Sequence, residues 1–433
     1  MRQPAVRAAC HRALEARERL LKDYPRWEDW RAQAQAIKAE AISQLDEMLA
    51  RLQRQVEAWG GQVFMARDGA AAREYILDTA RRHQVRAVVK SKSMTTEELA
   101  LNPFLTDAGL QVAETDLGEF IVQLAGHPPA HLTAPAMHLD RRRIAAIFQE
   151  RLGEACAPEP EPLTRLAARH LRLLYREAHM GITGVNFAAA AEGTLVLLEN
   201  EGNLRLTACL PRVHLAVMGL EKVIPALAQV EVFLRLLPAS ATGQRLTALV
   251  HFIRGLKPHP GGRQAFHLVL LDNGRRQLAQ EPELLEALYC LRCGACLNVC
   301  PVFQVGSAHL YRRVYPGAIG ILLAPYLAPR GDVSDLCTQC GACQEICPVK
   351  ILLAEKIIQA RRRSARHRPW RFFSRAAGLG LAWPRIYRRL EPGLRLLPRL
   401  PFKSREFLGI ALSSHSFHKC VGKKGEPGNR EKG

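Results

Sequence analysis

The chain has 433 residues, 48% of them hydrophobic, which is enough for two to three domains that each bury a core. It contains no run of about 18 uncharged apolar residues, which excludes a bilayer-spanning helix, and no apolar signal segment near Met1, so we predict a cytoplasmic protein. The net charge is +20, and residues 361–433 alone carry 19 Lys and Arg against 4 Asp and Glu, so the basic excess belongs mainly to the tail.

Residues 1–60 are predicted to form two N-terminal helices, over 5–22 and 26–59, because apolar residues recur there at helical spacing. Residues 61–275 alternate between short apolar runs and helical patterns, which is typical of an α/β domain with a largely parallel sheet. The predicted strands are 62–66, 86–90, 111–114, 119–124, 205–209, 214–218, 247–252 and 266–271, with a hairpin over 184–192 and 194–199. The predicted helices are 70–84, 95–108, 163–179 and 220–236, the second opened by a Thr95-x-x-Glu98 capping box.

Eight of the twelve cysteines form two copies of one pattern, Cys-x2-Cys-x2-Cys-x3-Cys-Pro. This spacing is typical of bacterial ferredoxins that hold two [4Fe–4S] clusters, in which the fourth cysteine of each run binds the other cluster. We therefore assign one cluster to Cys290, Cys293, Cys296 and Cys347, and the other to Cys300, Cys337, Cys340 and Cys343. Structural zinc usually takes four ligands in two Cys-x2-Cys pairs, and disulfides need an oxidising compartment, so both alternatives fit the pattern less well.

The two motifs lie in a ferredoxin-like domain predicted over residues 283–363, with short helices at 283–291 and 351–363. Residues 364–433 are predicted to be a basic, partly disordered tail, with 413–433 fully disordered. A tail of this charge suits an acidic protein partner or peripheral contact with the inner face of the membrane. No nucleic-acid recognition motif, dinucleotide-binding glycine motif or phosphate-binding loop accompanies it, so we predict neither a nucleic-acid partner nor a nucleotide cofactor.

A ligand pocket is predicted at the ends of the parallel strands, around Lys90, Lys92 and Glu192. The two lysines follow a strand and precede a helix N-terminus, a place that attracts anions such as carboxylate or phosphate. The alternative is a capped helix with solvated lysines, and Glu192 fits a surface turn equally well. Cys209, within an apolar run, is interpreted as a packed core residue.

Seven stretches resemble the LUD domain: Val89–Thr95, Glu114–Phe120, Gln123–Gly126, Gly181–Phe187, Glu192–Leu197, Asn200–Gly202 and Leu210–His214. With two cluster motifs downstream, and the segment Val314–Gly320 between them, the chain resembles the lactate utilization protein B family over roughly residues 20–360. The resemblance implies a fold of the ribose-phosphate isomerase and CoA-transferase type. It also implies two partners, a cysteine-rich redox protein and a second LUD-domain protein. The chain departs from the family where Cys337 completes a fourth cysteine in the second motif, and its C-terminal region matches poorly.

Three functions compete at this point. The resemblance implies an iron–sulfur electron-transfer subunit of a multi-component system that oxidises L-lactate to pyruvate. Alternatively, the LUD domain is itself an enzyme that binds a small carboxylate or a CoA-like ligand, or the clusters only hold the domains together. Two clusters that share their ligands favour electron transfer over a purely structural role.

Overall fold

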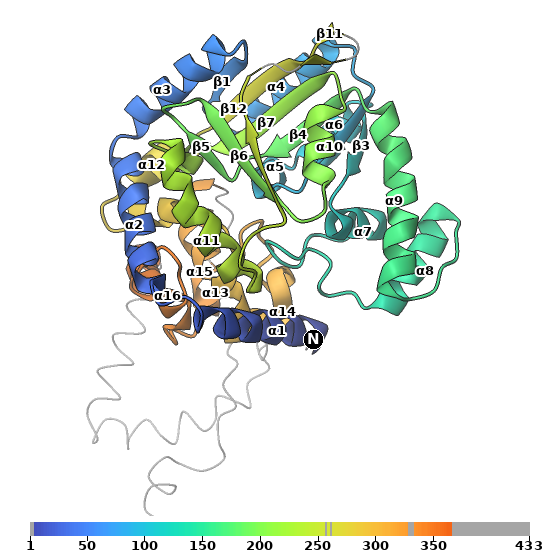
Figure 1. The fold of residues 1–433 in the computed structure, drawn as a ribbon. Helices are drawn as coiled ribbons and strands as arrows, with labels where there is room; N and C mark the ends of the chain where they lie inside the picture. Colours follow the sequence, from blue (N-terminus) through green and yellow to red (C-terminus); the bar gives the residue numbers. More distant parts are fainter. Residues whose placement is uncertain (1–3, 256–257, 260–261, 328–332, 366–433) are drawn as a thin grey trace, which may run out of the picture. The chain divides into compact units, whose positions relative to one another are not determined.

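The computed structural model describes residues 4–255, 258–259, 262–327 and 333–365, and the predicted disorder of the tail lies outside these residues. Residues 1–364 form one compact unit. The predicted α/β class is confirmed: a parallel sheet carries helices on its faces (Figure 1).

Three helices, not two, lead into the sheet: α1 (Pro4–Leu21), α2 (Trp27–Ser43) and α3 (Leu45–Ala58). The break is at Gln44, whose φ of −113° and ψ of 30° depart from helical values. The helices bury their apolar faces, as Ile37, Leu49 and Leu52 show. Helix α1 packs against the cysteine-rich segment as well as against α11 (Val230–Thr242), so the N-terminal residues join the two parts of the chain.

The main sheet has six parallel strands in the order β1-β12-β7-β4-β2-β3. Their bounds are β1 (Gln62–Ala66), β12 (Ala265–Leu271), β7 (Val213–Gly219), β4 (Met180–Gly184), β2 (Ala87–Lys90) and β3 (Gln111–Glu114). The central strand β7 is buried along its whole length, which explains why all its residues except His214 are apolar. The flanking helices include α4 (Gly69–Arg82), α5 (Met94–Glu98), α6 (Leu101–Asp107), α8 (Arg141–Leu152) and α9 (Pro160–Glu177).

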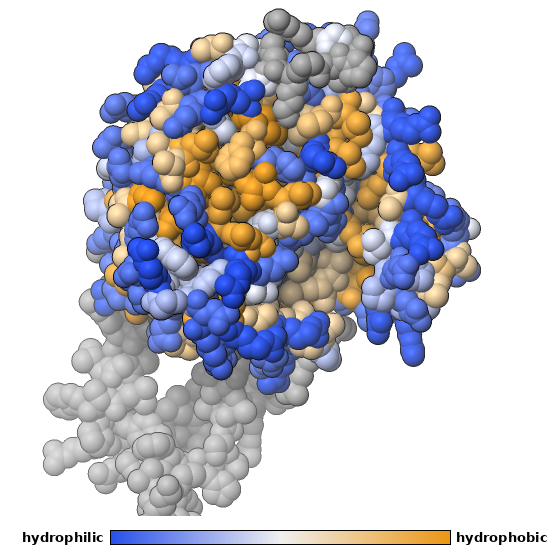
Figure 2. All heavy atoms as spheres, viewed as in Figure 1, coloured by the Kyte–Doolittle hydropathy of each residue, from blue (hydrophilic) through white to orange (hydrophobic). Residues whose placement is uncertain are grey.

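A second sheet of four strands, β8-β5-β6-β9, contains the predicted hairpin. Strands β5 (Phe187–Ala189) and β6 (Thr194–Glu199) pair antiparallel, while β8 (Val223–Ile224) and β9 (Leu249–Ile253) flank them. Two very short strands, β10 (Pro258–His259) and β11 (Gly262–Arg263), pair separately. Figure 2 shows apolar side chains gathered on the face where β5 and β6 lie in Figure 1. Phe252, on the edge strand β9, is 53% exposed.

Two predicted strands are helices in the structure. Residues 119–124 belong to α7 (Leu117–Ala125), because the Asp116 carboxylate accepts the backbone N–H groups of Gly118 and Glu119 and starts a helix there. Residues 205–209 belong to α10 (Asn203–Cys209), which leaves Cys209 exposed and not in the core. Both segments are short and mix apolar with polar residues, and periodicity over so few residues does not distinguish a strand from a helix turn.

Two predicted helices also begin elsewhere. Ser93, not Thr95, caps α5, and its Oγ accepts the Thr96 N–H. The region predicted as one helix from residue 220 contains a short 3-10 turn, η1 (Leu220–Lys222), then β8 and a second turn, η2 (Leu227–Gln229). Helix α11 itself starts only at Val230.

The cysteine-rich segment is built from short helices linked by tight loops. They are α12 (Arg275–Ala279), η3 (Leu285–Tyr289), α13 (Ala295–Asn298), α14 (Pro301–Tyr311), α15 (Gly317–Leu327), η4 (Ser334–Leu336), α16 (Ala342–Glu345) and α17 (Leu353–Ala365). Their apolar residues share one continuous core with the N-terminal helices and the small sheet. No helix among the described residues is long and apolar enough to cross a membrane.

Candidate functional site

The two cysteine loops, residues 290–296 and 337–343, have the same backbone conformation. Arg292 and Gln339 occupy equivalent positions with φ values of 62° and 58°, and Gly294 and Gly341 follow with 79° and 80°. In each loop a backbone N–H, from Arg292 or Gln339, donates to the first cysteine sulfur at 3.4 Å. The sequence repeat is therefore a structural repeat.

Cys290, Cys293, Cys296 and Cys347 line one cavity, which we call the cysteine cavity. Its remaining walls are mostly apolar and include Ile319, Val349, Ile351 and Leu353. Burial, together with Cys290 and Cys347, raises the pKa of Cys293 to about 12. Four thiols that face one apolar cavity are a donor set that fits an iron–sulfur cluster, and metal binding displaces their protons.

The other four motif cysteines also lie near one another. Burial raises the pKa of Cys343 to about 12, and the nearby Cys337, Cys300 and Cys340 add to this effect. Cys343 also acts on Cys296 of the first set, so the two sets are neighbours. Among the described residues, no three His, Cys, Asp or Glu side chains converge closely enough to share a single metal ion.

The two loops differ in exposure. The first loop is buried from Leu291 to Ala295, whereas Thr338, Gln339 and Cys340 of the second loop are exposed. Arginines from outside the loops hold the loop backbones. Arg31 of α2 donates to the Cys347 carbonyl at 2.8 Å, and Arg361 of α17 donates to the Cys337 carbonyl at 2.6 Å.

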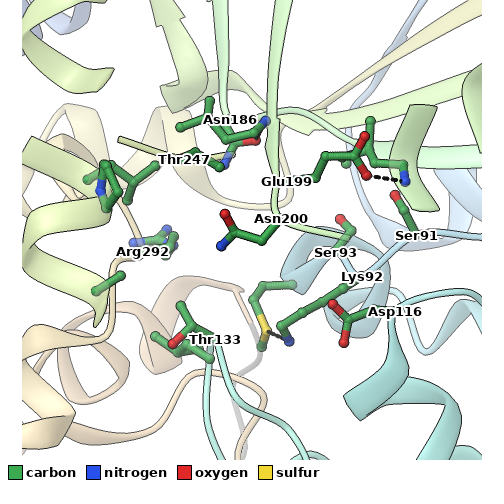
Figure 3. Close-up of a pocket in the computed structure, with 18 of the residues that line it drawn as sticks. Ser91, Lys92, Ser93, Asp116, Thr133, Asn186, Glu199, Asn200, Thr247 and Arg292 are labelled. Atoms are coloured by element: carbon green, nitrogen blue, oxygen red, sulfur yellow. Dashed lines mark hydrogen bonds between the residues drawn. The ribbon is translucent and has the colours of Figure 1, made fainter. Parts of the chain in front are cut away.

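A cavity of about 310 Å³, which we call the main pocket, lies where the two sheets meet the first cysteine loop. Figure 3 shows Lys92, Ser93 and Asp116 on one side and Arg292 on the other, with Asn200 between them. Tyr315, from the segment between the two motifs, also lines it. Leu132, Leu291 and Arg292 line both the main pocket and the cysteine cavity, so they form a shared wall.

Of the three pocket residues predicted from the sequence, Lys92 alone lines the main pocket. Its Nζ lies 2.7 Å from Glu119 Oε1. Lys90 is fully buried, with Nζ 2.7 Å from Glu114 Oε1 and 3.3 Å from Glu97 Oε1. Burial alone would lower the pKa of Lys90, but the two carboxylates outweigh it and hold the pKa above its ordinary value. Glu192 lies outside the lining and accepts the backbone N–H of Leu227 at 2.9 Å.

Carboxylates line the wall of the main pocket on the Asp116 side, namely Asp116, Glu199 and Glu201. Glu199 Oε1 lies 2.5 Å from His251 Nε2, and its Oε2 accepts the Leu204 N–H. Burial and the nearby Asp116 raise the pKa of Glu201 to about 7. The pocket therefore has a cationic side with Arg292, and an opposite side where carboxylates lie beside Lys92, which is itself paired with Glu119.

A buried ion-pair network supports the cationic side. Arg275 is fully buried and donates from Nη1 and Nη2 to Glu98, at 2.9 and 2.8 Å, and from Nε to Glu221 at 2.5 Å. The second Glu221 oxygen accepts from Arg292 Nη2 at 3.0 Å. Tyr315 donates to Glu98 at 2.8 Å, and the Arg292 guanidinium lies 4.9 Å from the centre of its ring. This network fixes the cysteine loop against the main sheet.

Comparison with known proteins identifies both parts of the chain. Residues 49–264 match the LUD domain, and residues 286–351 match the 4Fe-4S dicluster domain. Lactate utilization protein B of Shouchella clausii is 39% identical over 412 residues, which cover 93% of this chain and 86% of that protein. The chain belongs to the lactate utilization protein B family.

Two further similarities were found. An Escherichia coli protein named uncharacterized electron transport protein YkgF is 42% identical over 334 residues, covering 77% of this chain and 70% of that protein. A crystal structure of a DUF162 family protein from Deinococcus radiodurans covers 52% of this chain and 98% of that chain, with 13% identity and a TM-score of 0.30. The predicted order of a LUD domain followed by a 4Fe-4S domain is confirmed.

Sequence reasoning missed several residues of the site in this family member. Arg292 is an unspecified position of the cysteine motif, and Lys222 lies outside the seven stretches that resemble the LUD domain. Tyr315 belongs to the segment Val314–Gly320 that resembles the family, which was the one available signal. Gly320 is required there, because a Cβ atom on it would lie 1.7 Å from the Tyr315 carbonyl oxygen.

Proposed function

We propose that this chain is the iron–sulfur electron-transfer subunit of a multi-component system that oxidises L-lactate to pyruvate. Cys290, Cys293, Cys296 and Cys347 would hold one [4Fe–4S] cluster, and Cys300, Cys337, Cys340 and Cys343 the other. Each cluster, when bound, accepts and donates one electron at a time. The name of the relatives and the match of residues 286–351 of this chain to the 4Fe-4S dicluster domain support this role.

The observation that carries the proposal is the wall shared by the main pocket and the cysteine cavity, formed by Leu132, Leu291 and Arg292. A ligand in the pocket would lie one layer of residues from the first set of cysteines. Cys340 in the second cysteine loop is exposed. This loop would therefore be the place where a redox partner contacts the protein. The two sets of cysteines would thus form a route for electrons from the main pocket to the exposed second loop.

The whole reaction removes two electrons and two protons from L-lactate, and the proposed system divides this work among several proteins. A cysteine-rich redox protein and a second LUD-domain protein are the proposed partners. The basic residues after position 364 are the proposed contact with an acidic partner or with the inner face of the membrane.

A second candidate function is that the LUD domain itself binds and transforms a small carboxylate. The main pocket favours it, because the pocket has about 310 Å³ of space and carries Lys92 and Arg292. The predicted pocket residues Lys90 and Glu192 would then act outside the lining, as supports for β2 and for the β5–β6 hairpin.

Reconstitution under anaerobic conditions distinguishes these functions. We expect this chain, the cysteine-rich protein and the second LUD-domain protein to reduce an artificial acceptor with L-lactate only when all three are present. The measurement is acceptor absorbance for every subset of the three proteins. Activity that persists without this chain would contradict the electron-transfer role, whereas activity of this chain alone would favour the second candidate.

A further inference from the structure

The buried charges beneath the main pocket do not balance. Three buried cations, Arg275, Arg292 and Lys222, surround two buried carboxylates, Glu98 and Glu221. Burial lowers the pKa of the nearby Lys38 to about 7, so this group is not counted as a full charge. Arg275 donates hydrogen bonds to both carboxylates, whereas Arg292 donates to Glu221 through Nη2 only. Lys38 bonds the backbone carbonyls of Glu221 and Val223, which carry no net charge. Because buried charge is costly without a counter-charge, this arrangement favours further anions, namely the cysteine ligands of the proposed cluster next to Arg292 and a ligand in the main pocket.

Two of these cations, Arg292 and Lys222, line the main pocket and have N–H donors for which no hydrogen-bond partner is found among the described residues. Arg292 Nη1 is buried without a hydrogen-bond partner, although the side chain is only 7% exposed. Lys222 lines the same pocket, and within the described part of the chain no hydrogen bond to its Nζ is found. A guanidinium with one free nitrogen next to a free ammonium is a site for a carboxylate.

The opposite wall limits which anion fits. Asp116 and Glu199 would repel a second negative charge, and Lys92 on the same side is already paired with Glu119, which disfavours phosphate and CoA-like ligands. Asn186 and Asn200 offer amides, and Ser91, Ser93 and Thr133 offer hydroxyls, to polar groups at the other end of a ligand. The lining therefore suits a mono-anion that also carries a hydroxyl or keto oxygen.

We propose that Arg292 and Lys222 bind the carboxylate of a small 2-hydroxy or 2-oxo acid, and that Arg292 couples this binding to the cluster held by Cys290. This inference rests on the proposed function, since it needs a cluster in the cysteine cavity. The guanidinium belongs to the residue whose backbone N–H contacts Cys290 Sγ, so its charge stabilises added electrons there. An anion bound to the guanidinium offsets that charge, and it therefore binds more tightly to the oxidised protein.

The second cysteine loop supplies a matched variant. Gln339 holds the position of Arg292 with a φ of 58° instead of 62°, so the loop backbone accepts Gln there without arginine. Arg292→Gln should thus preserve the loop while removing the cation. Arg292→Lys keeps the charge but not the fork of donors. Lys222→Gln removes the second cation from outside the loop, and Arg254→Gln, which contacts Trp59 instead of the pocket, is the control.

The first measurement is equilibrium dialysis of the full-length, reconstituted protein with labelled pyruvate and, separately, inorganic phosphate. We expect pyruvate binding to weaken by at least ~10-fold in Arg292→Gln and in Lys222→Gln, and to be unchanged in Arg254→Gln. We expect Arg292→Lys to bind pyruvate with intermediate affinity. Phosphate binding as tight as that of pyruvate, or unchanged pyruvate binding in both glutamine variants, would overturn the proposal.

The second measurement is the midpoint potential of the first cluster, followed by electron paramagnetic resonance with and without saturating pyruvate. If pyruvate prefers the oxidised protein tenfold, the potential falls by about 59 mV. This shift should disappear in Arg292→Gln. Iron content is recorded on the same samples: intact clusters without a pyruvate effect would refute this inference alone, whereas protein without bound iron would refute the proposed function.

Discussion

Replacing Arg275 with Met should lower the free energy of unfolding by about 5 kcal/mol, because it leaves two buried carboxylates without their main cation. Glu98 and Glu221 are each 1% exposed, so water cannot take the place of the guanidinium. The measurement is denaturant unfolding of the Arg275→Met variant. Arg276→Met is the matched control, because this neighbour in α12 pairs with the exposed Asp46 and should change stability by less than about 1 kcal/mol.

The loss should also depend on pH. Burial alone would raise the pKa of Glu221, but Arg275 and Arg292 hold it well below its usual range. The stabilisation is therefore present above the unfolded-state pKa of about 4.3 and is lost as the pH falls through the folded-state pKa. In Arg275→Met the carboxylate takes up a proton more readily, so the destabilisation should be larger at pH 8 than at pH 5. Equal losses at both pH values, or a loss no larger than that of Arg276→Met, would show that the network does not support the fold.

Cys296→Ser should remove roughly half of the bound iron, because it deletes one of four ligands of one proposed cluster. Cys343→Ser, at the equivalent position of the second motif, should remove the other half. Lactate-dependent electron transfer in the reconstituted system should be lost in both variants. Cys156→Ser, which lies outside both motifs, is the control and should keep all of its iron.

In the proposed ligand sets, the fourth cysteine of each motif binds the cluster of the other motif, and this exchange can be tested separately. Cys347 lines the cavity of the first set although it belongs to the second motif. Cys347→Ser should therefore give the same spectrum as Cys296→Ser, and Cys300→Ser the same spectrum as Cys343→Ser. If Cys347→Ser instead resembles Cys343→Ser, each motif holds its own cluster and the ligand sets assigned here are wrong.

Five of the six strands of the main sheet, all but β4 (Met180–Gly184), and the two cysteine motifs could be predicted from the sequence because their signals are local. Strand β7 is apolar except for His214, and the cysteine spacing brings three thiols to one loop. The error at α7 came from an apolar run of six residues, Glu119–Leu124, whose preceding Asp116 was the overlooked cap. Capping side chains distinguish helix from strand where periodicity over so few residues cannot.

The pocket could be predicted only in part because its residues come from distant parts of the chain. Lys92 was found from its place after β2, a position that parallel sheets often use for ligands. Lys90, two residues earlier, points to Glu114 on the neighbouring strand β3, and nothing in the sequence pairs these residues. Arg292 reaches the pocket because the cysteine loop packs against the main sheet through Glu221. Such contacts depend on how separate elements pack, which local patterns do not encode.

The most direct test of the central claim is the iron and acid-labile sulfide content of the anaerobically reconstituted, full-length protein. Two sets of four cysteines predict about eight irons and eight sulfides per chain, with two interacting signals after reduction. About four irons per chain, unchanged in Cys337→Ser and Cys340→Ser, would contradict the second cluster. Stoichiometric zinc with no sulfide would contradict the electron-transfer role altogether.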